Sequence, residues 1–442
     1  MTPLAVRPAP PPAAAHPRRA LLAGSAGNFV EWYEFGVYGC FATVIAAHFF
    51  TPPDAADPGA GPLLATYASF ALAFFFRPAG AVLFGRLADR VGRRPTLITV
   101  VCLMTLATTA IGVLPTRATA GDAAPWLLTL LRALQGLSAG GEFGGAVALM
   151  TESAPPGRRG RYGAWQSFTV ALGLLCGAGA AALLASLLSP EALYAWGWRI
   201  PFLTALPLGL AALWLRTGLT EPDRPPPART VGPARPAGPA GTADPPVLAR
   251  MIALGVGRVM GWSAAGYTFL VVLPSYLQAT LGASFREALL ATTLANIGFA
   301  ASILPAGALS DRVGRRPVML CGAVTVTVFA LPLLRLLQDP GTSTAVRAAA
   351  VLAAGAAVGL LAGPGPAMLA EMFPAGVRCT GLGVAYALAN AVFSGCAGLV
   401  ITALVSTTGN ADIPAYYAAG ACALSAVALA GLNGDDHRRE LR

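Results

Sequence analysis

Apolar segments of about 20 or more residues, separated by short polar loops, follow one another along most of the chain. A helix rises about 1.5 Å per residue, so about 20 residues cross the roughly 30 Å hydrocarbon core of a bilayer. The segments are continuously apolar rather than alternating, which argues against a transmembrane β-barrel. Hydrophobic residues make up 55% of the chain and charged residues 11%, whereas a soluble domain carries roughly 25% charged residues. We therefore predict an all-α membrane protein with about twelve transmembrane helices, near residues 24–47, 63–85, 96–114, 125–150, 162–188, 198–215, 251–278, 287–309, 317–338, 347–371, 380–406 and 413–432.

The basic residues predict the orientation of these helices. An even number of spans places both termini on one side, and loops rich in arginine stay on the cytoplasmic side. On the predicted topology the arginines gather on that same side, at Arg18, Arg19, 86–94, 158–161, Arg224, Arg229, Arg235, 312–316, Arg378 and 438–442. We therefore expect a multi-pass protein of the cell membrane with both termini in the cytoplasm. The net charge of +10 follows from this topology, and without interleaved aromatic residues it does not indicate nucleic-acid binding.

The chain shows no sequence pattern of an enzyme or a cofactor-binding protein. Its seven cysteines are scattered, with no CxxC pair and no spacing typical of metal ligands. No nucleophile motif and no phosphate-binding loop is present. We expect neither a metal nor a cofactor.

A repeated loop divides the chain into two halves. Gly85-Arg-Leu-Ala-Asp-Arg-Val-Gly-Arg-Arg-Pro95 returns 222 residues later as Gly307-Ala-Leu-Ser-Asp-Arg-Val-Gly-Arg-Arg-Pro317. A second set, Glu152, Pro155 and Arg159, returns as Glu371, Pro374 and Arg378. A duplication of six spans explains both repeats. We predict tails at 1–20 and 433–442, six-helix bundles at 21–216 and 251–432, and a Pro-rich cytoplasmic linker at 217–250.

The chemistry of the repeated loop indicates a gating element. We expect Gly85 to allow two helices to approach closely, Asp89 to accept hydrogen bonds from the start of a neighbouring helix, and Gly92 to form a tight turn. The arginines are expected at the level of the lipid headgroups. The alternative is a charged turn that only obeys the positive-inside rule. The predicted gating residues are Gly85, Asp89, Arg90, Gly92, Arg93, Arg94, Gly307, Asp311, Arg312, Gly314, Arg315, Arg316, Glu152, Arg159, Glu371 and Arg378.

Few ionisable residues lie inside the predicted spans, and each is a candidate for function because a charge in a membrane costs about 2.5–3.5 kcal/mol. The acids are Glu31 and Glu34 in the first span and Glu142 in the fourth. Burial disfavours the ionised carboxyl and a nearby arginine favours it, so the protonation of such a group can respond to a solute. We expect Glu31, Glu34 and Glu142 as candidates for proton coupling. Alternatively, one glutamate is structural and pairs with Arg77.

Other polar residues are predicted to line a central cavity. Arg132, Gln135 and Glu142 fall within a stripe roughly 80° wide on one helix, and Asn28 shares a helix face with Glu31. Arg77 and Arg132 could hold a solute carboxylate or could neutralise a glutamate. Aromatic and amide side chains that either line the cavity or only pack are Trp165, Gln166, Tyr267, Tyr386 and Asn390.

The two repeated loops resemble the signature loop of the major facilitator superfamily. Further segments are similar to its metabolite:proton symporters, namely Gly27–Phe35, Phe76–Gly80, Arg132–Gly136, Gly140–Gly145 and Trp196–Phe202. The resemblance implies two six-helix bundles around a central cavity, and proton-driven import of a small polar metabolite. Carriers for proline and betaine, ketoglutarate, citrate and shikimate belong to that group. The expected partners are a solute, protons and the lipid bilayer, and the expected state is a monomer.

Two other functions are compatible with the same topology. A proton-coupled efflux antiporter usually has a Gly-Pro motif in its fifth span, where this chain has Gly173-Leu-Leu-Cys-Gly177. A membrane sensor that binds solute without moving it normally carries a signalling domain, and here the longest predicted cytoplasmic stretch is the short linker. Arg77 and Arg132 favour a solute with a carboxylate, either an organic acid or a zwitterion such as proline or betaine.

Overall fold

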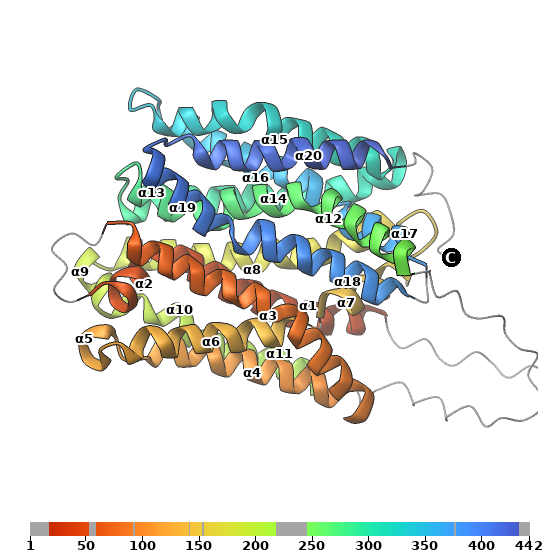
Figure 1. Ribbon diagram of the computed structural model, residues 1–442, viewed down its shortest axis with the longest axis horizontal. Helices are drawn as coiled ribbons and strands as arrows, with labels where there is room; N and C mark the ends of the chain where they lie inside the picture. Colours follow the sequence, from red (N-terminus) through yellow and green to blue (C-terminus); the bar gives the residue numbers. More distant parts are fainter. Residues whose placement is uncertain are drawn as a thin grey trace, which may run out of the picture.

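The computed structural model describes residues 17–52, 59–91, 93–140, 142–152, 154–217, 245–374 and 377–432. Within these ranges the regular structure is helical and there is no β-strand. The helices lie side by side along one direction, with those of the first half below those of the second half in Figure 1. This arrangement confirms the predicted all-α fold of two six-helix bundles.

The described part of the first half contains six long helical segments. In chain order they are α1 (Pro17–Cys40) with α2 (Ala42–Ile45) and η1 (Ala46–Phe50); α3 (Gly61–Val91); α4 (Arg93–Val113); α6 (Ala123–Ala139) with α7 (Glu142–Glu152); α8 (Arg159–Leu187); and α9 (Pro190–Ala192) with η2 (Leu193–Gly197), α10 (Arg199–Leu203) and α11 (Ala205–Thr217). A short helix, α5 (Arg117–Ala120), lies in the connection between α4 and α6. The elements marked η are turns of π-helix.

The second half repeats this order. Its segments are α12 (Pro245–Tyr267) with η3 (Thr268–Val272) and α13 (Leu273–Ala279); α14 (Phe285–Val313); α15 (Arg315–Gln338); α16 (Thr344–Ala362) with α17 (Gly365–Met372); α18 (Arg378–Ala389) with η5 (Asn390–Gly395) and α19 (Ala397–Thr408); and α20 (Ile413–Ala430). The segment predicted as the linker lies mostly outside the described residues, and α12 begins six residues before the start predicted for its span.

Nine of the helical segments within the described residues are long and apolar enough to cross a membrane. The three predicted spans outside this set are the first, third and fourth. The first carries Glu31 and Glu34, the third has a shorter apolar part at Ile98–Val113, and the fourth is divided between α6 and α7.

Close contact between helices depends on glycine at several positions. The backbones of α3 and α6 touch at Gly136 and Gly140, where a Cβ would overlap the carbonyl oxygens of Ala73 and Arg77. The two halves touch at Gly160 on α8 and Gly307 on α14, where a Cβ on Gly160 would lie 2.5 Å from the Gly307 carbonyl oxygen. Since the contact between α8 and α14 is one of the two most extensive between the described helices, these glycines set how closely the bundles pack.

The second copy of the repeated loop joins the two halves. We call the end of the molecule that holds both loops (85–95 and 307–317) the repeat face and the opposite end the far face. Asp311 accepts hydrogen bonds from the backbone N–H groups of Gly160 (2.7 Å) and Arg161 (2.9 Å) at the start of α8. Gly314 has a φ of +99°, the left-handed region in which only glycine is unstrained. Asp311 and Gly314 thus have the acceptor and turn geometry that is expected of Asp89 and Gly92 in the first copy, where it stays a prediction.

Arg315 is buried within the protein. Its side chain is 3% exposed and binds both Glu371 (2.9 Å) and Asp311 (2.7 Å), and these two carboxylates offset the loss of water. Arg312, Arg316 and Arg90 are exposed. Arg378 pairs with Glu152 across the halves, with 2.6 Å between Nη1 and Oε1. The residues of the first copy whose side chains lie outside the described residues are Gly85, Asp89, Gly92, Arg93 and Arg94.

Candidate functional site

Among the side chains that the structure describes in the first half, four charged ones are buried, on three different helices. Glu31 and Glu34 extend from α1, Arg77 from α3 and Arg132 from α6, with residue exposures of 7%, 1%, 5% and 1%. Burying a charge without a partner is costly, so the contacts of each group decide which role it can have.

Arg77 is paired with Glu31. Nη2 of Arg77 lies 2.9 Å from Oε1 of Glu31, which corresponds to the structural pairing considered as an alternative above. The guanidinium also lies over the rings of Phe74 (4.3 Å) and Phe35 (4.9 Å). Aromatic faces attract cations, so these contacts hold Arg77 against α1 and α3.

Arg132 is held at one end and has unused donors at the other. Its Nη1 donates to Oε1 of Gln135 at 2.7 Å, while its Nε and Nη2 have no hydrogen-bond partner among the described residues. The guanidinium lies over the rings of Tyr38 (4.1 Å), Phe70 (4.8 Å) and Phe35 (5.0 Å). A guanidinium can bind a carboxylate through two parallel N–H groups, and Arg132 retains two nitrogens for such a ligand.

Glu34 is buried beside Arg132 without a hydrogen-bond donor. Neither of its carboxyl oxygens has a hydrogen-bond partner among the described residues. The neighbouring polar side chain is Thr108 on α4, and the charges within interaction range are Glu31 and Arg132. Glu34 is therefore the acid of this cluster that is not tied to an arginine, in contrast to Glu31.

The second half covers the cluster with aromatic side chains. The ring of Tyr267 on α12 packs edge-on against Phe74 (5.5 Å) and Phe70 (6.0 Å), and its hydroxyl has no hydrogen-bond partner in the described part of the chain. Tyr386 on α18 stacks on Phe143 of α7, with ring centroids 3.4 Å apart. Asn390 turns inward within η5, where Oδ1 accepts from Ser394 at 2.9 Å. Through Tyr267, the cluster thus lies beside the contact between the halves.

Three of the predicted lining residues lie at the contact between α1 and α8. Asn28 donates to the Thr169 hydroxyl at 2.6 Å and to the carbonyl of Gln166 at 3.2 Å. Trp165 donates from Nε1 to Ser25 at 3.0 Å. These bonds connect two helices of one bundle. The side chain of Glu142, predicted as a third acid, lies outside the described residues.

Sequence reasoning missed the aromatic rings and the threonine that surround the charges. Phe70, Phe74 and Arg77 are spaced i, i+4 and i+7 on α3, which places them on one helix face. That spacing could have identified the rings. Thr108 carries no such signal, because threonine is common in apolar helices where its hydroxyl bonds to the preceding turn.

The halves touch on both sides of the site. On the repeat face they are joined by the pairs that involve Asp311 and Arg378. Towards the far face, the hydroxyls of Tyr67 and Ser275 lie 2.5 Å apart, and Thr43 donates to Oε1 of Gln278 at 2.9 Å. Contacts between the halves therefore lie on both sides of the site.

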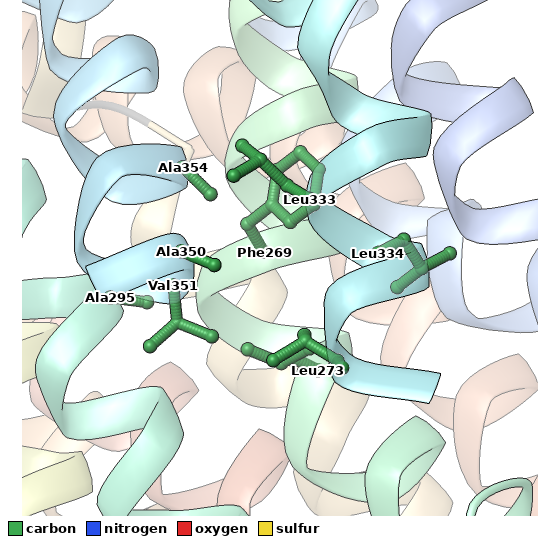
Figure 2. A pocket seen from close by; sticks show the side chains of 9 residues that line it. Phe269, Leu273, Ala295, Leu333, Leu334, Ala350, Val351 and Ala354 are labelled. Atoms are coloured by element: carbon green, nitrogen blue, oxygen red, sulfur yellow. The ribbon is translucent and has the colours of Figure 1, made fainter. Parts of the chain in front are cut away.

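The cavity shown in Figure 2 does not belong to this site. It is a space of about 10 Å³ inside the second bundle, with entirely apolar side chains from η3, α13, α14, α15 and α16 around it, among them Phe269, Leu273, Leu333 and Ala354. A second space of about 10 Å³ adjoins Glu31 and Ser138. Such a volume is close to the minimum that holds one water molecule.

Comparisons with known proteins agree with this architecture. The family described as "Sugar (and other) transporter" matches residues 20–224, and the family described as "Major Facilitator Superfamily" matches residues 254–441. A solved structure of the proton:xylose symporter XylE has the same fold, with a TM-score of 0.74, 18% identity, and coverage of 94% of this chain and 95% of that one.

Curated relatives are similar over most of their length. The alpha-ketoglutarate permease of Escherichia coli is 37% identical over 88% of this chain and 87% of its own. The glycine betaine/proline/ectoine/pipecolic acid transporter OusA of Dickeya dadantii is 34% identical over 90% of this chain and 80% of its own. The citrate-proton symporter of Klebsiella pneumoniae is 34% identical over 90% and 88%.

Proposed function

The chain belongs to the major facilitator superfamily and is a multi-pass secondary transporter of the cell membrane, and on this basis we propose that it imports a small carboxylate-bearing solute together with a proton. The solute is an organic acid or a zwitterion such as proline or betaine. Three relatives are named for solutes of these two kinds, and one of them is named as a proton symporter.

The observation that carries the proposal is the arrangement of Arg132 and Glu34. Arg132 offers two nitrogens without a partner among the described residues in a buried, aromatic-lined site, and Glu34 lies beside it without a donor. Buried polar groups without partners in a native structure are commonly completed by a ligand, a proton or a water molecule. A solute carboxylate would accept hydrogen bonds from the two free nitrogens of Arg132, and a proton would neutralise Glu34.

Each of the buried acids has a different place in this proposal. Glu34 carries the coupled proton, since it has no cationic partner in contact. Glu31 holds Arg77 in position through the 2.9 Å pair. Glu142 remains a candidate for proton coupling. Protonation and solute binding together then bias the exchange between states open to either side.

The cross-bundle contacts support alternating access. The bonds of Asp311 to the N–H groups of Gly160 and Arg161 and the Arg378–Glu152 pair must separate when the repeat face opens. The Tyr67–Ser275 and Thr43–Gln278 bonds must separate when the far face opens. We propose that the repeat face is cytoplasmic, because the arginines lie there, and that the protein works as a monomer of two bundles.

Cysteine labelling tests this orientation. In a chain whose seven cysteines are replaced by serine, Thr407→Cys marks the far face and Arg316→Cys the repeat face; both positions are exposed. A membrane-impermeant maleimide is expected to label Thr407→Cys in intact cells and Arg316→Cys only after permeabilisation. The reverse pattern would contradict the proposed orientation.

Uptake into proteoliposomes tests the function. Vesicles with an alkaline interior are supplied with labelled α-ketoglutarate, citrate, shikimate, proline or betaine outside. We expect accumulation of at least one solute above its external concentration, and loss of that accumulation when a protonophore removes the pH gradient. Proton-dependent loss of a preloaded solute from vesicles with an acidic exterior, with no uptake of any solute, would instead favour efflux.

Arg132→Lys tests the carboxylate site. Lysine keeps the positive charge but cannot bind a carboxylate through two parallel N–H groups. We expect the KM for the transported solute to rise about 10–100-fold, since a charge-assisted hydrogen bond contributes about 1.5–3 kcal/mol. Arg335→Lys is the control, because Arg335 is 61% exposed and pairs with Asp412 at the far face. An unchanged KM in Arg132→Lys would contradict the proposal that Arg132 binds the carboxylate of the solute.

A further inference from the structure

Two side chains of α12 carry buried hydroxyls without a hydrogen-bond partner among the described residues. Ser263 is 4% exposed and Tyr267 is 5% exposed, and the partner is missing both for Oγ of Ser263 and for the hydroxyl of Tyr267. The two residues are four apart in the sequence, so they lie on one face of the helix. A buried polar group without a partner is costly, and in a native structure it commonly binds a ligand or a water molecule. These hydroxyls are therefore candidates for contact with the solute.

This face of α12 adjoins the charged cluster of the first half. The ring of Tyr267 packs against Phe70 and Phe74, with ring centroids 6.0 and 5.5 Å apart. The guanidinium of Arg132 lies 4.8 Å from the centroid of Phe70, and that of Arg77 lies 4.3 Å from the centroid of Phe74. The tyrosine of one half and the arginines of the other thus contact the same two rings. A solute bound to Arg132 is therefore expected to reach α12.

Uncharged polar groups of the second half surround these hydroxyls. Oγ of Ser394, in η5, lies 3.3 Å from the carbonyl oxygen of Ser263 and 2.9 Å from Oδ1 of Asn390. Ser394 is fully buried and Asn390 is 3% exposed. We call Ser263, Tyr267, Asn390 and Ser394 the neutral patch, because its side chains carry hydroxyl and amide groups and no charge.

The buried arginines of the described second half are engaged away from the neutral patch. Arg258, on α12, donates to a carbonyl at the end of α20 at 3.2 Å. At about 100° per residue, Arg258 lies about 140° around the helix from Ser263 and about 180° from Tyr267. Arg315 and Arg378, with their carboxylate partners, belong to the contacts at the repeat face. The polar groups that α12 and η5 bring together here are therefore neutral.

The charges of the first-half cluster favour a solute with a single negative charge. Glu31 and Arg77 neutralise each other, and a protonated Glu34 has no charge, so Arg132 leaves one positive charge among the described residues of the cluster. A monoanion balances it. A zwitterion leaves the positive charge in place, and a dicarboxylate leaves a negative one. An unbalanced charge in a buried, aromatic-lined site is costly.

We infer that the solute is a hydroxylated monocarboxylate, whose carboxylate binds Arg132 and whose hydroxyl groups bind Ser263 and Tyr267 of the neutral patch. The inference rests on the proposed function, namely on the carboxylate contact of Arg132 and on a proton carried by Glu34, and it narrows the solutes considered there. A solute hydroxyl both donates and accepts hydrogen bonds, so it can pair with a serine or tyrosine hydroxyl in either direction. Such a solute contacts both halves and so favours the state in which they meet around it.

Isothermal titration calorimetry on the purified chain tests this solute class, at a mildly acidic pH that favours protonated Glu34. Shikimate and gluconate are a cyclic and an open-chain hydroxylated monocarboxylate. Cyclohex-1-ene-1-carboxylate and hexanoate are their analogues without hydroxyl groups. For at least one of the hydroxylated acids we expect a Kd at least about tenfold lower than for its analogue, because a site built to bond a hydroxyl rejects the molecule that lacks it. The same acid should bind at least about tenfold more tightly than α-ketoglutarate, citrate, proline or betaine.

Variants of the chain assign the two ends of the solute. Tyr267→Phe and Ser263→Ala each remove one hydroxyl, and each is expected to raise the Kd of the hydroxylated acid about tenfold and that of its analogue less than about twofold. Arg132→Lys should weaken both members of the pair, since both carry the carboxylate. Tyr417→Phe is the control, because the hydroxyl of Tyr417 donates to the carbonyl of Phe393 at 2.8 Å within the second half. It should change neither Kd.

The results separate the inference from the proposed symport. Tighter binding of a dicarboxylate, citrate, proline or betaine than of either hydroxylated acid would overturn the solute class and leave the symport intact. Equal weakening of both members of a pair in Tyr267→Phe and in Ser263→Ala would assign these hydroxyls to packing and would also overturn the inference. If a hydroxylated acid binds as expected but enters proteoliposomes without a proton, the symport is contradicted while the contacts of Arg132, Ser263 and Tyr267 stand.

Discussion

We expect Glu34→Gln to abolish accumulation of the solute while preserving its exchange across the membrane. Glutamine resembles the protonated glutamate in shape and carries no charge, so the variant stays in the state that binds solute but cannot release a proton. A proton that moves down 100 mV releases about 2.3 kcal/mol, which supports about fiftyfold accumulation of a co-transported solute, since 1.4 kcal/mol corresponds to a factor of ten. The ratio of internal to external solute is expected to fall from this range to about one.

Two further measurements complete this experiment: counterflow, which is the exchange of labelled for unlabelled solute, in Glu34→Gln, and the same assays on the variant Glu31→Gln. Counterflow in Glu34→Gln is expected to remain within about threefold of the unmodified chain. Glu31→Gln provides the comparison, because it breaks the pair with Arg77 and leaves an uncompensated buried guanidinium. That variant should lose counterflow as well as accumulation. If Glu34→Gln still accumulates solute, the coupled proton must be carried by another acid, and Glu142 is the next candidate.

We expect Gly160→Val to block transport by preventing closure of the repeat face. A Cβ on Gly160 would overlap Nη1 of Arg315 and would lie 2.5 Å from both the Gly307 carbonyl oxygen and Oγ of Ser310. Backbone atoms cannot move aside without separating α8 from α14. The same change displaces Asp311 from the N–H group of Gly160. Net uptake should therefore fall at least about a hundredfold.

The conformational effect of this variant can be measured directly. Ser167 on α8 is fully buried and donates to the carbonyl of Ala362 across the halves at 2.7 Å, so Ser167→Cys reports opening from the repeat face. In Gly160→Val it should react with a thiol reagent at least about tenfold faster. Gly179→Val is the matched control, because a Cβ at that position of α8 meets nothing within 4 Å. Normal transport by Gly160→Val would contradict the tight bundle contact.

The sequence predicted the architecture well because each bundle uses strong local signals. Long apolar segments indicated the spans, and the repeated loop indicated the division into halves and the acceptor role that Asp311 performs. The same reasoning placed Arg77, Arg132 and Glu34 in one site, since ionisable residues are rare inside membrane helices.

What the sequence did not predict depends on packing between distant segments. The burial of Arg315 follows from the positions of Glu371 and Asp311, which lie on two helices. Phe35 lies against both Arg77 and Arg132, a contact that requires three helices to meet. The neighbourhood of Thr108 and Glu34 depends on how α4 lies beside α1, and no residue pattern on either helix encodes that orientation.

The central claim is that solute and proton enter together, and proton movement driven by a solute gradient tests it most directly. Proteoliposomes containing the unmodified chain and a pH-sensitive dye in the lumen, with no imposed pH gradient or membrane potential, receive the transported solute outside. The account predicts acidification of the lumen that depends on that solute, and no acidification in Glu34→Gln. Entry of labelled solute with no change in luminal pH, or with alkalinisation, would contradict the account.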